Sequence, residues 1–150
     1  INRGKYVLAC TSSGGLFMDA IVFRISHDRF WIVQPDGNLH TWLEAHKGNF
    51  DITICDPNSR VLQLQGPKSF DIINLASNGV IDDKFGYFHS AFVEIGNQTL
   101  FVSRTGWTGE LGYEIYTLGK ETNAAQLWDK LMQIGSSYGL KFSSMAHNVG

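Results

Sequence analysis

The stretch SRTGWTGELGYEIY, residues 103–116, constrains the fold of this 150-residue chain more than any other. It places three glycines and one acid between two segments rich in strand-forming residues, which predicts a strand, a turn-rich loop and a second strand. Glycine would let the loop backbone approach a ligand closely, and Glu110 would then offer a carboxylate to the hydrogen-bond donors of a ring. A hairpin loop whose glycines serve only the backbone is the alternative reading of the spacing.

The glycine spacing excludes two common nucleotide-binding loops. A dinucleotide fingerprint needs a strand followed by a helix, whereas this loop lies between two predicted strands. The stretch also lacks the Gly-Lys-Ser/Thr ending of a P-loop. We therefore expect neither a Rossmann site nor a phosphate-binding P-loop.

Locally paired strands with helices between them are predicted along the rest of the chain. Hairpin signals join residues 20–25 to 30–33, and residues 89–95 to 99–104. Further strands are expected at residues 6–11, 50–54, 61–64 and 113–118. Helices are expected at residues 38–47, 67–76 and 124–135, with Pro67 at a first helical position. Because pairing is local and regular crossovers are lacking, the chain is predicted to have an α+β fold with a largely antiparallel sheet.

The composition is that of a soluble globular protein and excludes several kinds of partner. With 12 basic and 14 acidic residues, a net charge of -2 and no basic run, the chain has no electrostatic footprint for nucleic acid. Its apolar runs are short, so no membrane span or signal peptide is expected. Cys10 and Cys55 lack metal-ligand spacing and are expected to be buried thiols. The histidines are scattered, so no metal site is expected either.

Three motifs together resemble the aminomethyltransferase family, which comprises the glycine-cleavage T-protein and its relatives. Residues 103–116 resemble the folate-binding signature of that family. Residues 14–22, GGLFMDAIV, resemble its Gly-Gly-x-x-Asp-Asp segment and the apolar strand that follows, and residues 64–69, LQGPKS, resemble its Leu-Gln-Gly-Pro segment. The motifs occur in family order and span most of the chain, which argues against chance similarity.

The resemblance implies a fold, a cofactor and a type of reaction. Residues 1–150 would form the central portion of a single folate-binding domain, in a chain that we expect to be a fragment of a longer protein. The cofactor would be tetrahydrofolate, and the reaction would transfer a methyl or aminomethyl unit from a small amine or methylated donor. Such a protein is expected in the cytoplasm, without a nucleic-acid or membrane partner, and its oligomeric state is left open.

The resemblance also assigns individual residues. Asp19 takes the catalytic position near N5 and N10 of the folate, and Glu110 hydrogen-bonds the pterin ring, since a carboxylate can accept from two adjacent N–H donors. Asp19 is expected at the start of an apolar strand, in a pocket where it would stabilise a cationic donor or manage a folate proton. Gln34 would present its amide to the ligand. Trp31 would wall a small cation, with a place in the core as its alternative.

Departures from the family pattern bear on the branch and on the activity. Met18 replaces the first acid of the Asp-Asp pair, and this step resembles the demethylase-like branch that includes dimethylsulfoniopropionate demethylase. The Ala-Arg-Asp step of the family reads Ala-His-Asn here, so His147 would stand in place of the arginine. Two alternatives stay open: a non-catalytic folate-binding or regulatory module, and the folate domain of a flavin-dependent dimethylglycine or sarcosine oxidoreductase.

Overall fold

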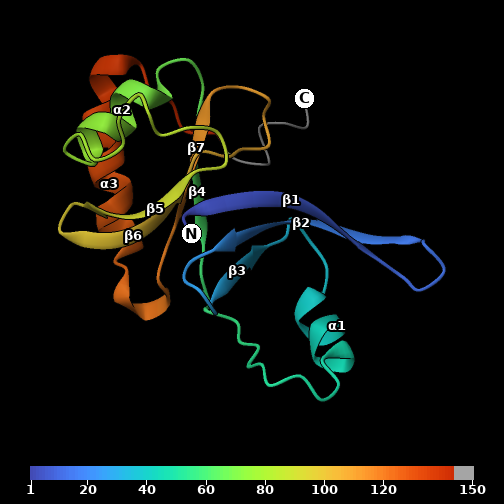
Figure 1. Ribbon diagram of the computed structural model, residues 1–150. Helices are drawn as coiled ribbons and strands as arrows, with labels where there is room; N and C mark the ends of the chain where they lie inside the picture. The colour runs from blue at the N-terminus through green and yellow to red at the C-terminus, as the bar shows by residue number, and fades with distance from the viewer. Residues whose placement is uncertain (144–150) are drawn as a thin grey trace.

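The computed structural model describes residues 1–143, which form two antiparallel sheets and three α-helices (Figure 1). In chain order the elements are β1 (Arg3–Cys10), β2 (Leu16–Arg24), β3 (Phe30–Val33), α1 (Leu39–His46), β4 (Val61–Gln65), α2 (Ser69–Ala76), β5 (Ser90–Ile95), β6 (Gln98–Ser103), β7 (Gly112–Tyr116) and α3 (Ala124–Gly135). The smaller sheet has the order β1-β2-β3, and the larger one β4-β7-β6-β5. The predicted α+β class with antiparallel pairing is confirmed.

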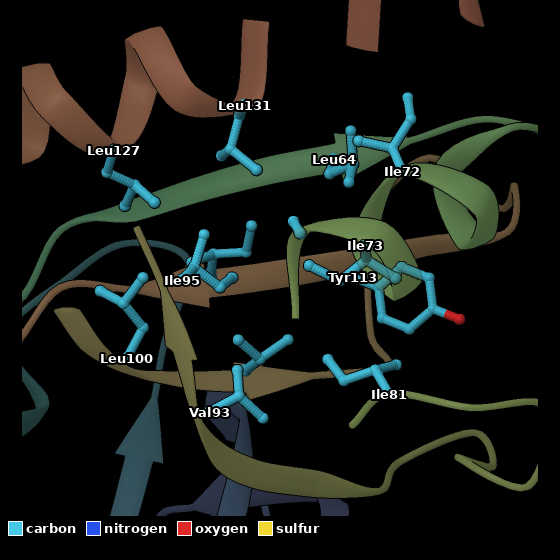
Figure 2. Close-up of a cluster of buried hydrophobic side chains, with 13 residues drawn as sticks. Leu64, Ile72, Ile73, Ile81, Val93, Ile95, Leu100, Tyr113, Leu127 and Leu131 are labelled. Carbon is cyan, nitrogen blue, oxygen red and sulfur yellow. The ribbon is translucent and has the colours of Figure 1, made fainter. Parts of the chain in front are cut away.

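The larger sheet is the centre of the molecule, because both of its faces are covered. Helices α2 and α3 pack on one face, where alternate strand residues meet the apolar sides of the helices (Figure 2). The residues of this core with no exposed surface are Ile73, Ile81, Ile95, Leu100, Val102, Ile115 and Leu127. This core fixes β6 and β7, and therefore also the two ends of the loop that joins them.

The smaller sheet packs on the opposite face of the larger one through aromatic rings. Phe101 of β6 lies at the centre of this contact: its ring centroid is 4.9 Å from that of Trp31 and 5.3 Å from that of Phe23. Tyr116 of β7 adds a third ring, 5.7 Å from Phe101. The molecule is thus layered as helices, large sheet and small sheet, with α1 beyond the small sheet (Figure 1).

A short backbone junction joins the two sheets at the start of β1. The amide of Gly4 donates to the carbonyl of Phe88 at 2.7 Å, and the amide of Ser90 donates to the carbonyl of Asn2 at 3.0 Å. Arg3 and His89 form the bridge between these two bonds. The start of β1 is therefore fixed to the start of β5, although the two strands belong to different sheets.

The strand expected at residues 50–54 is wrong. Residues 47–60 form neither helix nor strand, and the alternating apolar side chains Phe50 and Ile52 are 75% and 51% exposed. Alternation predicts a strand only where a neighbouring strand offers hydrogen-bond partners. Here β4 pairs with β7, and no strand edge lies against this segment in the described part of the chain.

Other boundaries differ in ways that affect the site. β2 begins at Leu16, four residues before the expected start, because Leu16, Met18 and Asp19 already pair with β1. Helix α2 begins at Ser69, so Pro67 lies in the preceding turn and not at the first helical position. The hairpin between β5 and β6 is confirmed, with positive φ at both Gly96 and Asn97 as a tight turn requires.

The two cysteines also differ from expectation, since both thiols are free and exposed. Cys10 lies at the end of β1, beside an irregularity in the pairing with β2, and Cys55 lies in the irregular segment 47–60. Neither position is covered by a second layer within residues 1–143.

Candidate functional site

The loop between β6 and β7 is joined to the segment that follows β4. The Gln65 side-chain oxygen accepts a hydrogen bond from the Thr108 hydroxyl at 3.0 Å, and its nitrogen donates to the Tyr113 carbonyl at 3.3 Å. The Leu111 carbonyl accepts from the Gly66 amide at 2.7 Å. The LQGPKS motif at residues 64–69 and the glycine-rich motif at residues 103–116 therefore form one structural unit, although they are far apart in the chain.

Glu110 lies at the exposed end of this loop. Its backbone amide donates to the Thr108 hydroxyl at 3.2 Å, which fixes the turn. Its carboxylate makes no hydrogen bond or ion pair within residues 1–143, so both oxygens can accept from a ligand. Its predicted contact with a pterin stays a prediction.

Asp19 lies within β2 and not at its start, as a consequence of the earlier beginning of the strand. Its Oδ2 accepts a hydrogen bond of 2.7 Å from the hydroxyl of Tyr6 on the neighbouring strand β1. This bond raises the pKa of the Tyr6 phenol, because ionisation would remove the donated proton beside a carboxylate. The partly exposed Asp19 carboxylate is thus oriented by a protonated tyrosine.

Asp19 points toward the same side as the residues that pack on the large sheet. Side chains alternate along a strand, so Asp19 shares a face with Ile21 and Phe23. Phe23 is fully buried against Phe101 and Tyr116 of the large sheet. Asp19 therefore lies on the face of the small sheet that packs on the large sheet. It lies outside the packed area, where its neighbour Tyr6 is exposed.

Trp31 and Gln34 are both engaged in the structure itself. One face of the Trp31 ring stacks on Phe101, which corresponds to the core role named as its alternative. The Gln34 nitrogen donates to the Gly37 carbonyl at 2.7 Å, and its oxygen accepts from the Leu39 amide at 3.2 Å. Gln34 thereby organises the turn that leads into α1, and ligand contacts by either residue stay predictions.

The sequence reading missed a buried acid, Glu114, in the middle of β7. Only 9% of its surface is exposed, and it lies on the face of the large sheet that meets the small sheet. Its Oε2 accepts from the hydroxyls of Thr105 at 2.5 Å and Tyr116 at 2.8 Å, and its Oε1 accepts from the Gln63 amide at 3.2 Å. The detectable signal was an acid that alternates with the apolar residues of a strand otherwise buried on both faces.

The hydrogen-bond donors around Glu114 leave one of its carboxylate oxygens able to accept a further hydrogen bond. Thr105 has a single hydroxyl hydrogen and gives it to Glu114, so Ser103, 2.5 Å away, donates to Thr105 in turn. Burial and the Glu114 carboxylate together raise the pKa of Tyr116 strongly, which keeps its phenol protonated as a donor. Two hydroxyls thus hold Oε2, while Oε1 has one amide partner and can accept another hydrogen bond.

Three other expectations concern absences or the chain end. Within residues 1–143 no group of three His, Cys, Asp or Glu side chains is arranged to hold a metal ion. No helix in that range is long and apolar enough to cross a membrane. His147, expected in place of the family arginine, lies outside the described residues.

Comparisons with known proteins support the resemblance. The family described as GCVT N-terminal domain matches residues 1–147. Aminomethyltransferases of Thermoanaerobacter pseudethanolicus and Chlorobaculum tepidum are each 34% identical to this chain, over 93% of its length. The match covers 39% of each relative, so the chain spans about two fifths of the length of these curated relatives.

Solved structures give the same result. The crystal structure of glycine cleavage system aminomethyltransferase T from Bartonella henselae aligns with a TM-score of 0.75 and 26% identity, covering 88% of this chain and 36% of that one. The heterotetrameric sarcosine oxidase from Corynebacterium sp. U-96 aligns with a TM-score of 0.63 and 20% identity, over 83% of this chain and 64% of that one, which is a likeness of fold alone. Since the family match extends over nearly every residue, this chain belongs to the GCVT N-terminal domain family.

Proposed function

We propose that this chain is the folate-binding part of an enzyme that transfers a methyl or aminomethyl unit from a small amine or methylated donor to tetrahydrofolate. The observation that carries the proposal is the buried Glu114 carboxylate. It lies on the face of the large sheet that meets the small sheet, and Asp19 lies on the face of the small sheet that meets the large one. In a chain of this family, Glu114 suits binding of the pterin ring, and Asp19 suits the transfer reaction itself.

The acidic side chains Glu114 and Glu110 fit the chemistry of a pterin. A pterin presents adjacent N–H donors along one edge, which a carboxylate oxygen with free lone pairs can accept. Glu114 retains that capacity at Oε1, and Glu110 retains it at both oxygens. When bound, tetrahydrofolate supplies the nitrogens that take up the one-carbon unit.

Asp19 is the proposed catalytic carboxylate. Tyr6 holds Oδ2, so Oδ1 is left to face the reacting groups. In that position an ionised carboxylate stabilises positive charge on the donor, or holds a proton exchanged with a folate nitrogen. Gln34 would contribute through its remaining amide capacity, and Trp31 through the ring face that Phe101 does not cover.

Two acids are candidates for the residue that hydrogen-bonds the pterin ring. Glu110 is the assignment that the resemblance implies, and its carboxylate has no partner among residues 1–143. Glu114 is the second candidate, favoured by its burial and by the hydroxyl pair that fixes its orientation. A buried, oriented acceptor loses less entropy on binding than an exposed and mobile one.

Calorimetric titration of the full chain with tetrahydrofolate distinguishes the two. Loss of a hydrogen bond to a charged group corresponds to roughly tenfold to hundredfold weaker binding. We expect that loss in Glu110→Ala if Glu110 is the anchor, and in Glu114→Gln if Glu114 is. Thermal unfolding of each variant checks that the fold is retained. Unchanged affinity in both variants would remove both residues from the pterin site.

The finer assignment within the family is also a proposal. The Met18-Asp19 step supports a place near the demethylase-like branch, and a panel of methylated donors that includes dimethylsulfoniopropionate tests it by turnover. A non-catalytic folate-binding module would bind tetrahydrofolate without turnover of any donor. The folate domain of a flavin-dependent oxidoreductase would be part of a polypeptide that also carries a dinucleotide fingerprint. A cytoplasmic location and a small-molecule donor belong to the same proposal.

A further inference from the structure

A cavity of about 280 Å³ opens on the side of the large sheet that carries the helices. Its walls come from the start of α2, from the loop after that helix, and from both ends of the loop between β6 and β7. Pro67, Phe70 and Leu111 make the apolar part of the lining. Sites for small molecules usually enclose about 300–1,000 Å³, so this cavity has the size of a site for a small ligand.

Tyr113 lines the cavity with a hydroxyl that has no hydrogen-bond partner within residues 1–143. The residue is 1% exposed, and Figure 2 shows its hydroxyl end pointing away from the apolar cluster to which its ring belongs. Among the buried and half-buried residues of that range, Ser90 Oγ is the one fully covered side-chain oxygen or nitrogen without a partner. The Tyr113 hydroxyl is therefore not fully covered, and the small surface that the residue retains is that of a phenolic donor at the cavity wall.

Arg104 places a positive charge near this phenol. Burial raises the pKa of Tyr113, and the charge of Arg104 opposes part of that rise, so the two groups lie within electrostatic reach of each other. Arg104 Nη1 donates to the Phe85 carbonyl at 3.1 Å, which holds the guanidinium in place. No carboxylate forms an ion pair with Arg104 within residues 1–143. The remaining guanidinium N–H groups and the Tyr113 hydroxyl are thus neighbouring donors without an acceptor.

Three aspartates, Asp71, Asp82 and Asp83, also line the cavity. Asp71 has a long contact of 3.8 Å with Lys68. Asp82 Oδ1 accepts from the Lys84 amide at 3.0 Å. Asp83 makes no hydrogen bond or ion pair within residues 1–143. These carboxylates retain lone pairs for a cationic donor, and they outnumber the single arginine of the lining.

We propose that this cavity binds an amino acid with an apolar side chain, in its zwitterionic form. The ligand carboxylate accepts from Tyr113 and Arg104, since charge-assisted bonds from arginine suit a carboxylate. The ligand ammonium donates to the aspartates, and the ligand side chain lies against Phe70 and Leu111. A purely anionic ligand would be repelled by the aspartates and a purely cationic one by Arg104, so a zwitterion suits both kinds of group.

This site is separate from the proposed folate site. Side chains alternate along β7, so Tyr113 and Glu114 point to opposite faces of the large sheet. Glu114 lies on the face that meets the small sheet, whereas Tyr113 belongs to the core beneath the helices. Binding of the amino acid therefore requires no tetrahydrofolate, and it can be tested in the absence of any folate.

The test is a titration of the isotope-labelled full chain with L-leucine, followed through the NMR shifts of its assigned backbone amides. Two analogues keep the same apolar body: isopentylamine lacks the carboxylate, and isocaproate lacks the ammonium. We expect saturable shifts around Tyr113, Arg104 and Asp83 with L-leucine, and a half-saturating concentration at least about tenfold higher for each analogue. Shifts that do not saturate, or an analogue that binds as tightly as L-leucine, would overturn the proposal.

Two variants test the individual side chains. Tyr113→Phe retains the ring in the core and should leave the unfolding temperature unchanged, because the hydroxyl has no partner to lose. It should raise the half-saturating concentrations of L-leucine and isocaproate about tenfold and leave that of isopentylamine unchanged. Asp83→Asn, at an exposed position, should instead weaken L-leucine and isopentylamine binding several-fold.

Asp129→Asn is the matched control for the loss of one carboxylate charge. Asp129 is exposed on α3 and does not line the cavity, so this variant should bind L-leucine as the parent chain does. If Tyr113→Phe and Asp83→Asn also bind L-leucine with the affinity of the parent chain, the assignment of the site is wrong.

Discussion

The side chain of Gln65 occupies the space into which a Cβ on Gly112 would project, and it also blocks a Cβ on Gly106. Two of the three glycines in the signature loop therefore accommodate a neighbouring side chain. The third, Gly109, has no atom near its Cβ position but adopts a φ of +75°, which glycine permits without strain. The loop glycines thus hold two sequence motifs together.

Gly112→Ala should destabilise the chain by about 1–3 kcal/mol, because the Gln65 amide must swing out and lose its hydrogen bonds to Thr108 and Tyr113. In a Gln65→Ala background the same change should be milder, with a coupling of at least about 1 kcal/mol. Urea unfolding of the four proteins of this cycle measures it.

Gly109→Ala is the matched control for that cycle. It should be destabilising by about 1–2 kcal/mol through backbone strain alone, and Gln65→Ala should leave that loss unchanged. Equal coupling of Gln65 to both glycines would contradict the packing explanation.

Stability should fall at alkaline pH through Tyr116. Its pKa is raised above the ordinary 10.0 by burial and by the Glu114 carboxylate, so the unfolded chain loses the phenolic proton at a lower pH than the folded chain does. Tyr116 therefore contributes its full stability below about pH 10, and this contribution is lost as pH rises above that value. Urea midpoints from about pH 8 to about pH 11 measure the slope.

Tyr116→Phe should flatten that alkaline slope, at a cost of roughly 1–2 kcal/mol at neutral pH from the lost hydrogen bond to Glu114. Tyr6 and Tyr113 also have raised pKa values and remain in the variant, so a residual slope is expected. The exposed Tyr87→Phe is the control. An unchanged slope in Tyr116→Phe would argue against this account.

Asp19→Asn should lower kcat by about a hundredfold or more, once a donor has been identified, since the carboxylate is the proposed catalytic group. Tyr6→Phe should lower kcat several-fold with little change in KM, because it removes only the hydrogen bond that orients Asp19. Steady-state kinetics on the full chain test both variants. Unchanged turnover in Asp19→Asn would falsify the catalytic assignment.

Phe50→Ser should change the free energy of unfolding by no more than about 0.5 kcal/mol, because its ring lies in solvent outside any sheet. Ile115→Ala, in the middle of β7, should be destabilising by about 3 kcal/mol because that side chain is fully buried. Thermal or urea unfolding compares the two. A large effect at Phe50 would mean that residues 50–54 pack as a strand after all.

The local signals in the sequence were sufficient for the hairpins and most of the helices. Either Asp36 or Asn38 could cap the helix expected from residue 38, and Asn38 does so, its side chain accepting from the Thr41 amide at 3.2 Å. The turn at Gly96 and Asn97 likewise follows from residues that tolerate positive φ. These features depend on neighbours in sequence, which a pattern can show.

Features that depend on distant neighbours could not be predicted in this way. The 50–54 segment has a strand pattern but no partner edge, and the start of β2 was hidden because Leu16 and Phe17 are exposed. Glu114 acquires its importance only when Thr105, Tyr116 and Gln63 converge on it. Motif resemblance directed attention to Glu110, although the buried acid lies four positions later.

Phe101 makes ring contacts with Phe23, Trp31, Phe92 and Tyr116, and so takes part in the packing of both sheets. Its phenyl ring serves as a spacer between the sheet that carries Asp19 and the sheet that carries Glu114. A smaller or larger residue at this position would change the spacing of the two sheets, and with it the separation of the two carboxylates. In related proteins, the size of the residue at position 101 should therefore vary together with those at positions 23 and 31.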